Sequence, residues 1–258
     1  MERFALRLQR EFMNAIPLDR GSAPSLALMG LEPLRAVFEY ARMRLSSQAA
    51  LPRGEGRCIV LFPGLAADKR SIRPFKSFFE GLDYAVHDWG RGLNTGPDGE
   101  PNAWLDDLAM HVQSLTSKNA DKISLVGWSL GGIYARELGK RLPDRVRQVI
   151  TLGTPFAGDV QHINVAWAYR LLNGRRPYLD AAMRAQLRRA PPMPTTSIYS
   201  RSDGIVAWRA CLQEGDAAHT ENIEVAGSHC GLAWNSTVLK ILADRLSQRD
   251  GHWQRYTA

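Results

Sequence analysis

Long apolar stretches are missing from this sequence, and their absence excludes several classes of protein. No apolar run approaches the roughly 18 residues that a membrane-spanning helix needs. Residues 1–14 mix arginine and glutamate with apolar residues, so we expect no secretory signal and a cytoplasmic location. Internal repeats and low-complexity tracts are also absent. A chain of 258 residues without these features is typical of one globular domain with a substantial core.

Cysteine is scarce. The chain has only Cys58, Cys211 and Cys230, and their spacing does not match a metal site. We interpret Cys58 as a small core residue at the start of a buried strand. A disulfide between Cys211 and Cys230 is left open, although a reducing cytoplasm argues against it. We expect neither a metal nor an organic cofactor.

Acidic residues are outnumbered, because 33 lysines and arginines against 26 aspartates and glutamates give a net charge of +7. The basic residues are scattered, and no basic stripe is interleaved with aromatic residues. We therefore expect no nucleic-acid partner. The charge is interpreted as a solvated basic surface, and attraction to anionic lipid or to an anionic substrate is the alternative.

The most informative stretch is residues 123–132, which read Ile-Ser-Leu-Val-Gly-Trp-Ser-Leu-Gly-Gly. The first four residues have the composition of a buried strand, and a helical pattern follows from Ile133. Gly127 to Gly131 fits G-x-S-x-G, which is a nucleophile elbow when it lies between a strand and a helix. The glycines leave room for a strained turn that exposes the Ser129 hydroxyl. The alternative is a glycine-rich turn that binds phosphate at a helix N-terminus.

Strand-like and helical patterns alternate through most of the chain, which predicts a mostly parallel sheet with helices on both faces. The strand-like runs are 58–62, 84–89, 123–126, 146–152, 196–200 and 223–225, and the helical patterns are 71–81, 102–117, 133–142 and 234–248. This α/β domain is expected to span residues 57–250. A loop rich in glycine and proline, residues 90–101, is expected to shape the rim of a pocket. Residues 251–258 are left as a tail.

Two segments stand apart from this alternation. Residues 1–56 are predicted to form a helical extension with two stretches at helical spacing. The first contains Phe4, Leu8, Phe12 and Ile16, and the second is amphipathic, begins just after Pro33 and contains Leu34, Val37, Phe38, Ala41 and Leu45. We interpret the extension as helices packed on the main domain, and an interfacial or partner-binding arm is the alternative. Residues from about 156 to 194 hold two short helical patterns and no strand, which predicts a helical cap insertion.

A serine hydroxyl needs a base to become a nucleophile near neutral pH, and the base needs an orienting acid. After an elbow of this kind the acid and then the histidine follow in chain order, each behind a strand. Asp203 and His229 each follow one of the last two strand-like runs. We therefore predict Ser129, Asp203 and His229 as the catalytic residues. A simple Asp-Gly turn is the alternative for Asp203, and Asp216 and Glu221 are weaker acids because they precede a strand.

The negative oxygen that forms during acyl transfer needs preorganised N–H donors. The backbone N–H of Leu130, which follows the nucleophile, is one predicted donor. The other is the N–H of Leu65, in the Phe62-Pro63-Gly64-Leu65 turn after the first strand. Gly64 would let the backbone approach a substrate closely, and an ordinary Pro-Gly turn is the alternative.

These segments together resemble the α/β-hydrolase superfamily and, within it, the bacterial lipases and esterases. Residues 127–132, 200–204 and 227–231 match the three catalytic segments, and Gly153-Thr154-Pro155 is similar to a stretch found in bacterial lipases. The elbow also resembles that of pimeloyl-ester carboxylesterases. The resemblance covers residues 57–248. The chain departs from it in having Pro63 where many relatives have histidine, and in lacking the opening β-hairpin, so we expect fewer than eight strands.

The resemblance implies a serine hydrolase that cleaves carboxylic esters through an acyl-enzyme on Ser129. The expected substrate is a small molecule with an acyl chain of modest or medium length, and a lipid-like substrate is left open. Acyl transfer and thioester hydrolysis use the same residues and are the alternatives, as is a catalytically silent fold that binds a lipid or a protein. Peripheral membrane contact is left open, and no pattern indicates an oligomeric state. An apolar acyl site in the cap would use Trp167, Tyr169, Leu171, Leu172 and Tyr178, and packing of the cap onto the domain is the alternative for these residues.

Overall fold

A single parallel sheet organises the structure, a computed structural model that describes residues 24–115, 122–157, 181–215 and 217–257. Its strand order within these residues is β2-β1-β3-β4-β5-β6, and every neighbouring pair is parallel. The strands are β1 (Cys58–Phe62), β2 (Ala85–Asp88), β3 (Ile123–Trp128), β4 (Val146–Leu152), β5 (Thr195–Tyr199) and β6 (Thr220–Glu224). The prediction of a mostly parallel sheet with fewer than eight strands is confirmed for the described part of the chain.

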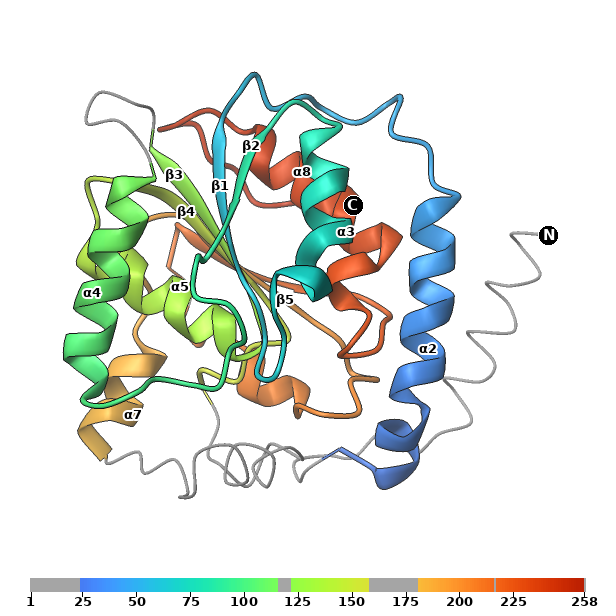
Figure 1. Cartoon of the computed structure of the whole chain (residues 1–258), viewed down its shortest axis with the longest axis horizontal. Helices are drawn as coiled ribbons and strands as arrows, with labels where there is room; N and C mark the ends of the chain where they lie inside the picture. Colours follow the sequence, from blue (N-terminus) through green and yellow to red (C-terminus); the bar gives the residue numbers. More distant parts are fainter. Residues whose placement is uncertain (1–23, 116–121, 158–180, 216, 258) are drawn as a thin grey trace.

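Helices cover both faces of this sheet (Figure 1). α3 (Lys69–Glu80) and α8 (Ser236–Ser247) pack on one face, where Phe79 and Leu242 are fully buried. α4 (Pro101–Ser114) and α5 (Leu130–Arg141) pack on the other, where Leu108 and Leu138 are fully buried. Because both faces are covered, the inner strands β1, β4 and β5 are buried along their whole length.

One long helix, α2 (Leu26–Arg44), precedes the sheet. The predicted stretch began only after Pro33, but the helix starts seven residues earlier and runs through this proline. Its start is set by Ser25, whose hydroxyl oxygen accepts a hydrogen bond from the Leu28 N–H at 3.2 Å. Proline removes one backbone donor from the helix interior. Packing along the length of α2 offsets that loss.

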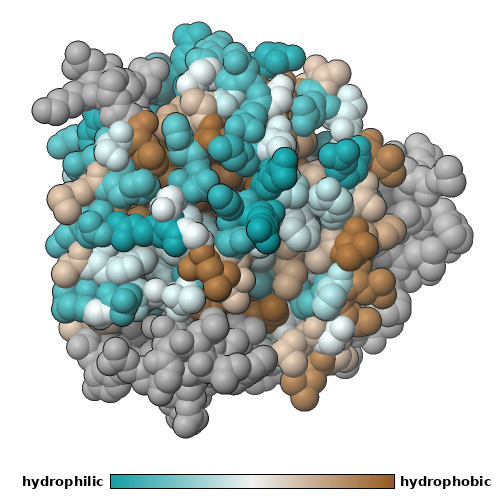
Figure 2. Space-filling view, in the orientation of Figure 1, coloured by the Kyte–Doolittle hydropathy of each residue, from teal (hydrophilic) through white to brown (hydrophobic). Residues whose placement is uncertain are grey.

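The face of α2 that packs on the domain is not the one predicted. The buried residues are Leu28, Glu32, Ala36, Glu39 and Met43, whereas the predicted stripe points outward. Leu34 is 69% exposed and Leu45 is 87% exposed, and Figure 2 shows apolar side chains gathered along this edge of the molecule. Apolar spacing selected the wrong face because the two buried glutamates have backbone partners elsewhere in the chain.

Several sequence-based predictions lie wholly or partly outside the described residues. They include the first helical stretch of the extension and most of the cap, with its five aromatic and leucine candidates for an acyl site. α7 (Ala181–Arg188) coincides with the second helical pattern of the cap.

No described helix has the length and apolar character needed to cross a membrane. The tail is joined to the sheet, because the Tyr256 N–H donates to a Glu221 carboxylate oxygen at 2.7 Å.

Candidate active site

Ser129 occupies the sharp turn between β3 and α5, with backbone angles φ 54° and ψ −122°. A positive φ is strained for a residue with a side chain, and here the Ser129 N–H is held by the Leu152 carbonyl oxygen at 2.8 Å. The flanking glycines make the turn possible. A Cβ on Gly127 would lie 2.3 Å from the Gly132 Cα, and one on Gly131 would lie 2.3 Å from the Phe62 carbonyl oxygen.

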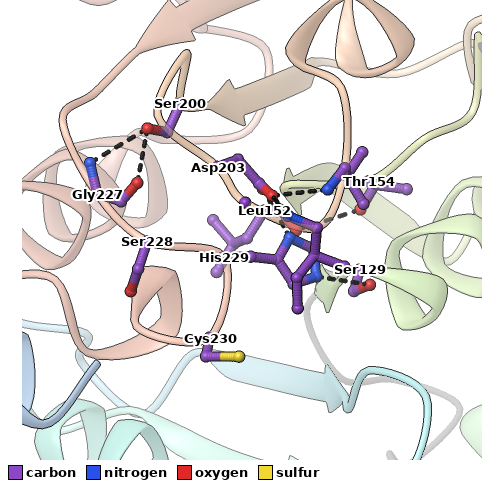
Figure 3. A network of polar contacts seen from close by, with 12 residues as sticks. Ser129, Leu152, Thr154, Ser200, Asp203, Gly227, Ser228, His229 and Cys230 are labelled. Atoms are coloured by element: carbon purple, nitrogen blue, oxygen red, sulfur yellow. Dashed lines mark hydrogen bonds and ion pairs between the residues drawn. The ribbon is translucent and has the colours of Figure 1, made fainter. Parts of the chain in front are cut away.

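The side chains of Ser129, His229 and Asp203 form one hydrogen-bonded line (Figure 3). The His229 Nε2 lies 2.9 Å from the Ser129 Oγ, and its Nδ1 lies 2.6 Å from the Asp203 Oδ2. The second oxygen of Asp203 accepts the N–H groups of Ile205 and Val206 at 2.8 and 2.7 Å. The structure therefore brings together the three side chains singled out in the sequence, from the loops after β3, β5 and β6.

Two opposing effects set the pKa of His229. Burial of the imidazole lowers its pKa, but the charge of Asp203, its hydrogen bond and the charge of Glu32 together outweigh burial, so the pKa is raised above its ordinary value. The side chains of His229 and Asp203 are only 5% and 2% exposed. A raised pKa suits a group that must accept a proton from a serine hydroxyl.

The predicted oxyanion donors belong to two segments that lie next to Ser129. Leu130 is the next residue and opens α5, and a Cβ on Gly64 would come 3.2 Å from the Ser129 Cβ, which places the turn containing Leu65 against the serine. Among the described residues, neither Leu130 nor Leu65 donates its N–H to a protein acceptor. The role of these two N–H groups as oxyanion donors stays a prediction.

Asn94 holds the turn that contains Leu65. Its side chain is fully buried and donates to the Pro63 carbonyl oxygen at 2.8 Å. Its backbone carbonyl accepts the Ala66 N–H at 2.7 Å, and its N–H donates to the Ala67 carbonyl oxygen at 2.8 Å. The sequence placed residue 94 in a loop of glycine, proline and asparagine but gave no reason to single it out.

The rival acids have other positions. Glu221 is buried on β6, where it pairs with the Arg245 guanidinium at 3.0 Å and accepts the Thr196 hydroxyl at 2.7 Å. Asp216 lies outside the described residues. Among the described candidates, only Asp203 contacts the histidine that in turn contacts Ser129.

All three cysteines are free thiols, so the disulfide left open by the sequence is absent from the structure. Burial, followed by the charge of Glu32, raises the pKa of Cys230 to about 12, and burial raises the pKa of Cys211 well above its ordinary value. Neither thiol is therefore a competing nucleophile at neutral pH. No group of three metal-ligating side chains occurs among the described residues.

Sequence reasoning also missed the residues that hold His229 in place. The Trp128 indole N–H donates to the His229 carbonyl oxygen at 3.0 Å. Glu32 and Glu39 of α2 accept backbone N–H groups from the loop around His229. In the sequence these are two acids seven positions apart among apolar and basic residues, and helical periodicity gives no reason to bury them.

A family model described as the alpha/beta hydrolase family matches residues 59–255. The chain belongs to this family.

Three solved structures show the same fold. A lipase B from Aspergillus fumigatus matches with a TM-score of 0.59 at 20% identity, over 79% of this chain and 56% of that one. One of the metagenome-derived lipolytic enzymes LipS and LipT matches with a TM-score of 0.57 at 14% identity, over 76% of this chain and 95% of that one.

A monoacylglycerol lipase from Paleococcus ferrophilus matches with a TM-score of 0.52 at 14% identity, over 75% of this chain and 96% of that one. The chain thus spans little more than half of the Aspergillus lipase but nearly all of the other two. At these identities the likeness concerns the fold. What this α/β hydrolase does must be argued from its own site.

Proposed function

We propose that this α/β hydrolase cleaves carboxylic esters through an acyl-enzyme on Ser129. The observation that carries the proposal is the hydrogen-bonded line from Asp203 through His229 to Ser129, with contacts of 2.6 and 2.9 Å. A serine on a strained turn, a buried base and an orienting acid are the three parts that nucleophilic acyl transfer needs. The intact line favours an active hydrolase over a catalytically silent binding protein.

In the first half of the reaction the Ser129 Oγ attacks the ester carbonyl carbon, and the His229 Nε2 takes the serine proton. The carbonyl oxygen becomes negative and accepts hydrogen bonds from the N–H groups of Leu130 and Leu65. The bond to the alcohol oxygen then breaks, and His229 gives its proton to the departing alcohol. Asp203 keeps the imidazole oriented and stabilises its charged form.

In the second half a water molecule attacks the acyl group on Ser129. His229 takes a proton from this water, a second tetrahedral intermediate forms, and the bond between the acyl carbon and the Ser129 Oγ breaks. The proton returns to the Ser129 Oγ and the carboxylic acid leaves. One water is consumed, one alcohol and one acid are released, and the enzyme is regenerated.

The substrate class follows from what the chain resembles. The similar structures named above are called lipases or lipolytic enzymes, which supports a lipid-like ester. Hydrolysis of a thioester, or acyl transfer to an acceptor other than water, would use the same three side chains in the same order. Product analysis separates these reactions.

A fluorophosphonate probe tests the proposal directly, because it labels only an activated serine. We expect the purified protein to be labelled, the Ser129→Ala variant to remain unlabelled, and p-nitrophenyl esters of graded acyl length to be turned over by the wild type alone. A folded wild type that neither reacts with the probe nor hydrolyses any ester of the series would refute the proposal. Hydrolysis of thioesters but not oxygen esters would redirect it to the thioesterase alternative.

A further inference from the structure

Helix α2 lies outside the residues that match the family, yet its inner face contacts two loops of the candidate site. We call residues 200–206 the acid loop, since it carries Asp203, and residues 226–231 the histidine loop, since it carries His229. Glu32, which is 2% exposed, is the residue of α2 that accepts hydrogen bonds from both loops. A carboxylate buried so completely has to be matched by hydrogen-bond donors.

The donors to Glu32 come from both loops. One carboxylate oxygen accepts the Gly204 N–H of the acid loop at 2.8 Å and the His229 N–H of the histidine loop at 2.9 Å. The other oxygen accepts the Cys230 N–H at 2.8 Å. Glu32 therefore binds the residue after Asp203, His229 itself and the residue after His229, and so fixes the spacing of the acid and the base.

Two neighbours on α2 extend the same contact. Arg35 donates to the Ser202 carbonyl oxygen at 2.6 Å and to the Ser202 hydroxyl at 2.9 Å. Glu39 is 5% exposed and accepts the Ser228 N–H at 2.8 Å and the Ser228 hydroxyl at 2.7 Å. Because Arg35 contacts the acid loop and Glu39 contacts the histidine loop, α2 supports both loops at several points along its length.

We infer that Glu32 is a positioning residue that holds the backbones of the acid and histidine loops in register, so that His229 stays aligned between Asp203 and Ser129. This inference rests on the proposed function for its catalytic meaning, but the alignment itself is a property of the folded protein. The charge of Glu32 has a second effect, because it is one of the groups that raise the pKa of His229. The other charged or titratable groups around the histidine loop are Asp203, Glu39, Cys230 and Arg35, whose guanidinium lies 3.7 Å from a Glu32 carboxylate oxygen.

The test compares Glu32→Gln and Glu32→Ala with Met43→Ala, a buried truncation on the same helix that lies in the hydrophobic core. Glutamine keeps one oxygen acceptor but places an amide against an N–H donor, whereas alanine removes all three acceptor contacts. We expect the rate of fluorophosphonate labelling of Ser129 to fall about 10- to 100-fold in Glu32→Ala, and less in Glu32→Gln. Met43→Ala should label at nearly the wild-type rate once it is folded.

A second readout does not depend on turnover. A proton shared between an imidazole Nδ1 and a carboxylate gives a strongly downfield proton resonance, which reports the contact between His229 and Asp203. We expect this resonance to weaken or shift in both Glu32 variants and the pKa of His229 to fall, because a negative charge beside the imidazole is gone. Met43→Ala should keep both the downfield resonance and the wild-type pKa of His229. These shifts distinguish positioning from a general loss of stability.

The inference would be overturned if a folded Glu32→Ala variant kept the labelling rate, the downfield resonance and the His229 titration of the wild type. A wild type that shows the resonance but is never labelled by the probe would count against the proposed function instead. In that case the resonance and the titration still decide whether Glu32 holds His229 in place.

Discussion

Gly204 of the acid loop lies directly against the backbone of Leu28 in α2. A Cβ built on Gly204 would come 2.5 Å from the Leu28 carbonyl carbon and 2.7 Å from the Met29 nitrogen. Backbone atoms cannot move aside as the end of a side chain can, so the two segments approach this closely only because residue 204 is glycine. The contact joins the residue after Asp203 to the first turn of a helix more than 170 positions earlier.

Gly204→Ala should therefore separate α2 from the acid loop. We expect a loss of about 1–3 kcal/mol in the free energy of unfolding, as for other overpacked sites, together with slower labelling of Ser129. The matched control is Gly30→Ala in the same helix, where nothing lies within 4 Å of the added Cβ. That variant should gain about 0.5–1 kcal/mol. Chemical denaturation measures both, and equal stability of the two variants would contradict the close approach.

Removal of residues 1–50 should abolish efficient hydrolysis. The deletion takes away the acceptors of the Gly204, Ser228, His229 and Cys230 N–H groups, and each buried donor left unsatisfied costs about 1–3 kcal/mol. A deletion of residues 1–22 keeps Ser25 and α2, and serves as the control. Ester turnover and thermal unfolding of the two shortened chains are the measurements. Full activity in the longer deletion would contradict the support of the site by α2, and a loss of membrane or partner binding alongside it would favour a separate interaction arm.

The pH dependence of kcat/KM should follow the protonation of His229. The imidazole acts as a base only when neutral, so activity should fall as the pH drops through its pKa. Because this pKa is raised, the midpoint of the acid limb should lie above the ordinary value near 6.5. Asp203→Asn removes the charge that contributes most to the increase, so the limb should move to lower pH while the plateau drops about 10⁴-fold. An unchanged midpoint in this variant would assign the limb to another group.

Asn94→Ala should impair stabilisation of the oxyanion without touching the line of Ser129, His229 and Asp203. The variant loses the amide that fixes the Pro63 carbonyl, so the Leu65 N–H would no longer be held beside Ser129. Removal of one oxyanion donor costs about 10²- to 10³-fold in kcat, and partial misplacement should cost less. Tyr134→Phe, which removes only a hydroxyl bound to Asn94 at 3.1 Å, is the matched control. A kcat equal to that of the control would exclude the role of Asn94.

The cysteine thiols should resist alkylation in the folded protein. Burial raises the pKa of Cys58 to about 11, and burial together with the charge of Glu32 raises the pKa of Cys230 to about 12, so the reactive thiolate is scarce at pH 7. Iodoacetamide followed by mass spectrometry should find these two residues modified only after denaturation. Cys230 is the informative case because it is partly exposed, and rapid modification of the native protein there would contradict the raised pKa.

The parts of the site that sequence reasoning reached are those encoded locally or by order along the chain. Ser129 is marked by a glycine two positions before it and another two positions after it, and Asp203 and His229 follow the last two described strands in turn. Parallel strands deliver their carboxyl ends to one edge of the sheet, so order alone brought these side chains together. The parallel sheet was predictable as well, because the alternation of strands and helices is also encoded by order along the chain.

The support of the site was out of reach because it depends on contacts between distant backbone groups. Glu32 and Glu39 are charged residues on a helix with many apolar neighbours, and periodicity assigns such residues to solvent. What buries them is a set of N–H donors from loops near the other end of the chain. Backbone N–H groups have no signature in the sequence, and neither does the amide of Asn94 that reaches Pro63.

The contact between Glu32 and His229 closes a loop of 197 residues, which has a consequence for biosynthesis. Ribosomes add about 5–20 residues per second, so α2 is made roughly 10–40 s before the histidine loop that it supports. During that interval the helix exposes two acids and an apolar face without their final neighbours. Hydrolytic competence should therefore appear late, after the histidine loop has been released and has met α2, which makes ester turnover a sensitive reporter of complete folding.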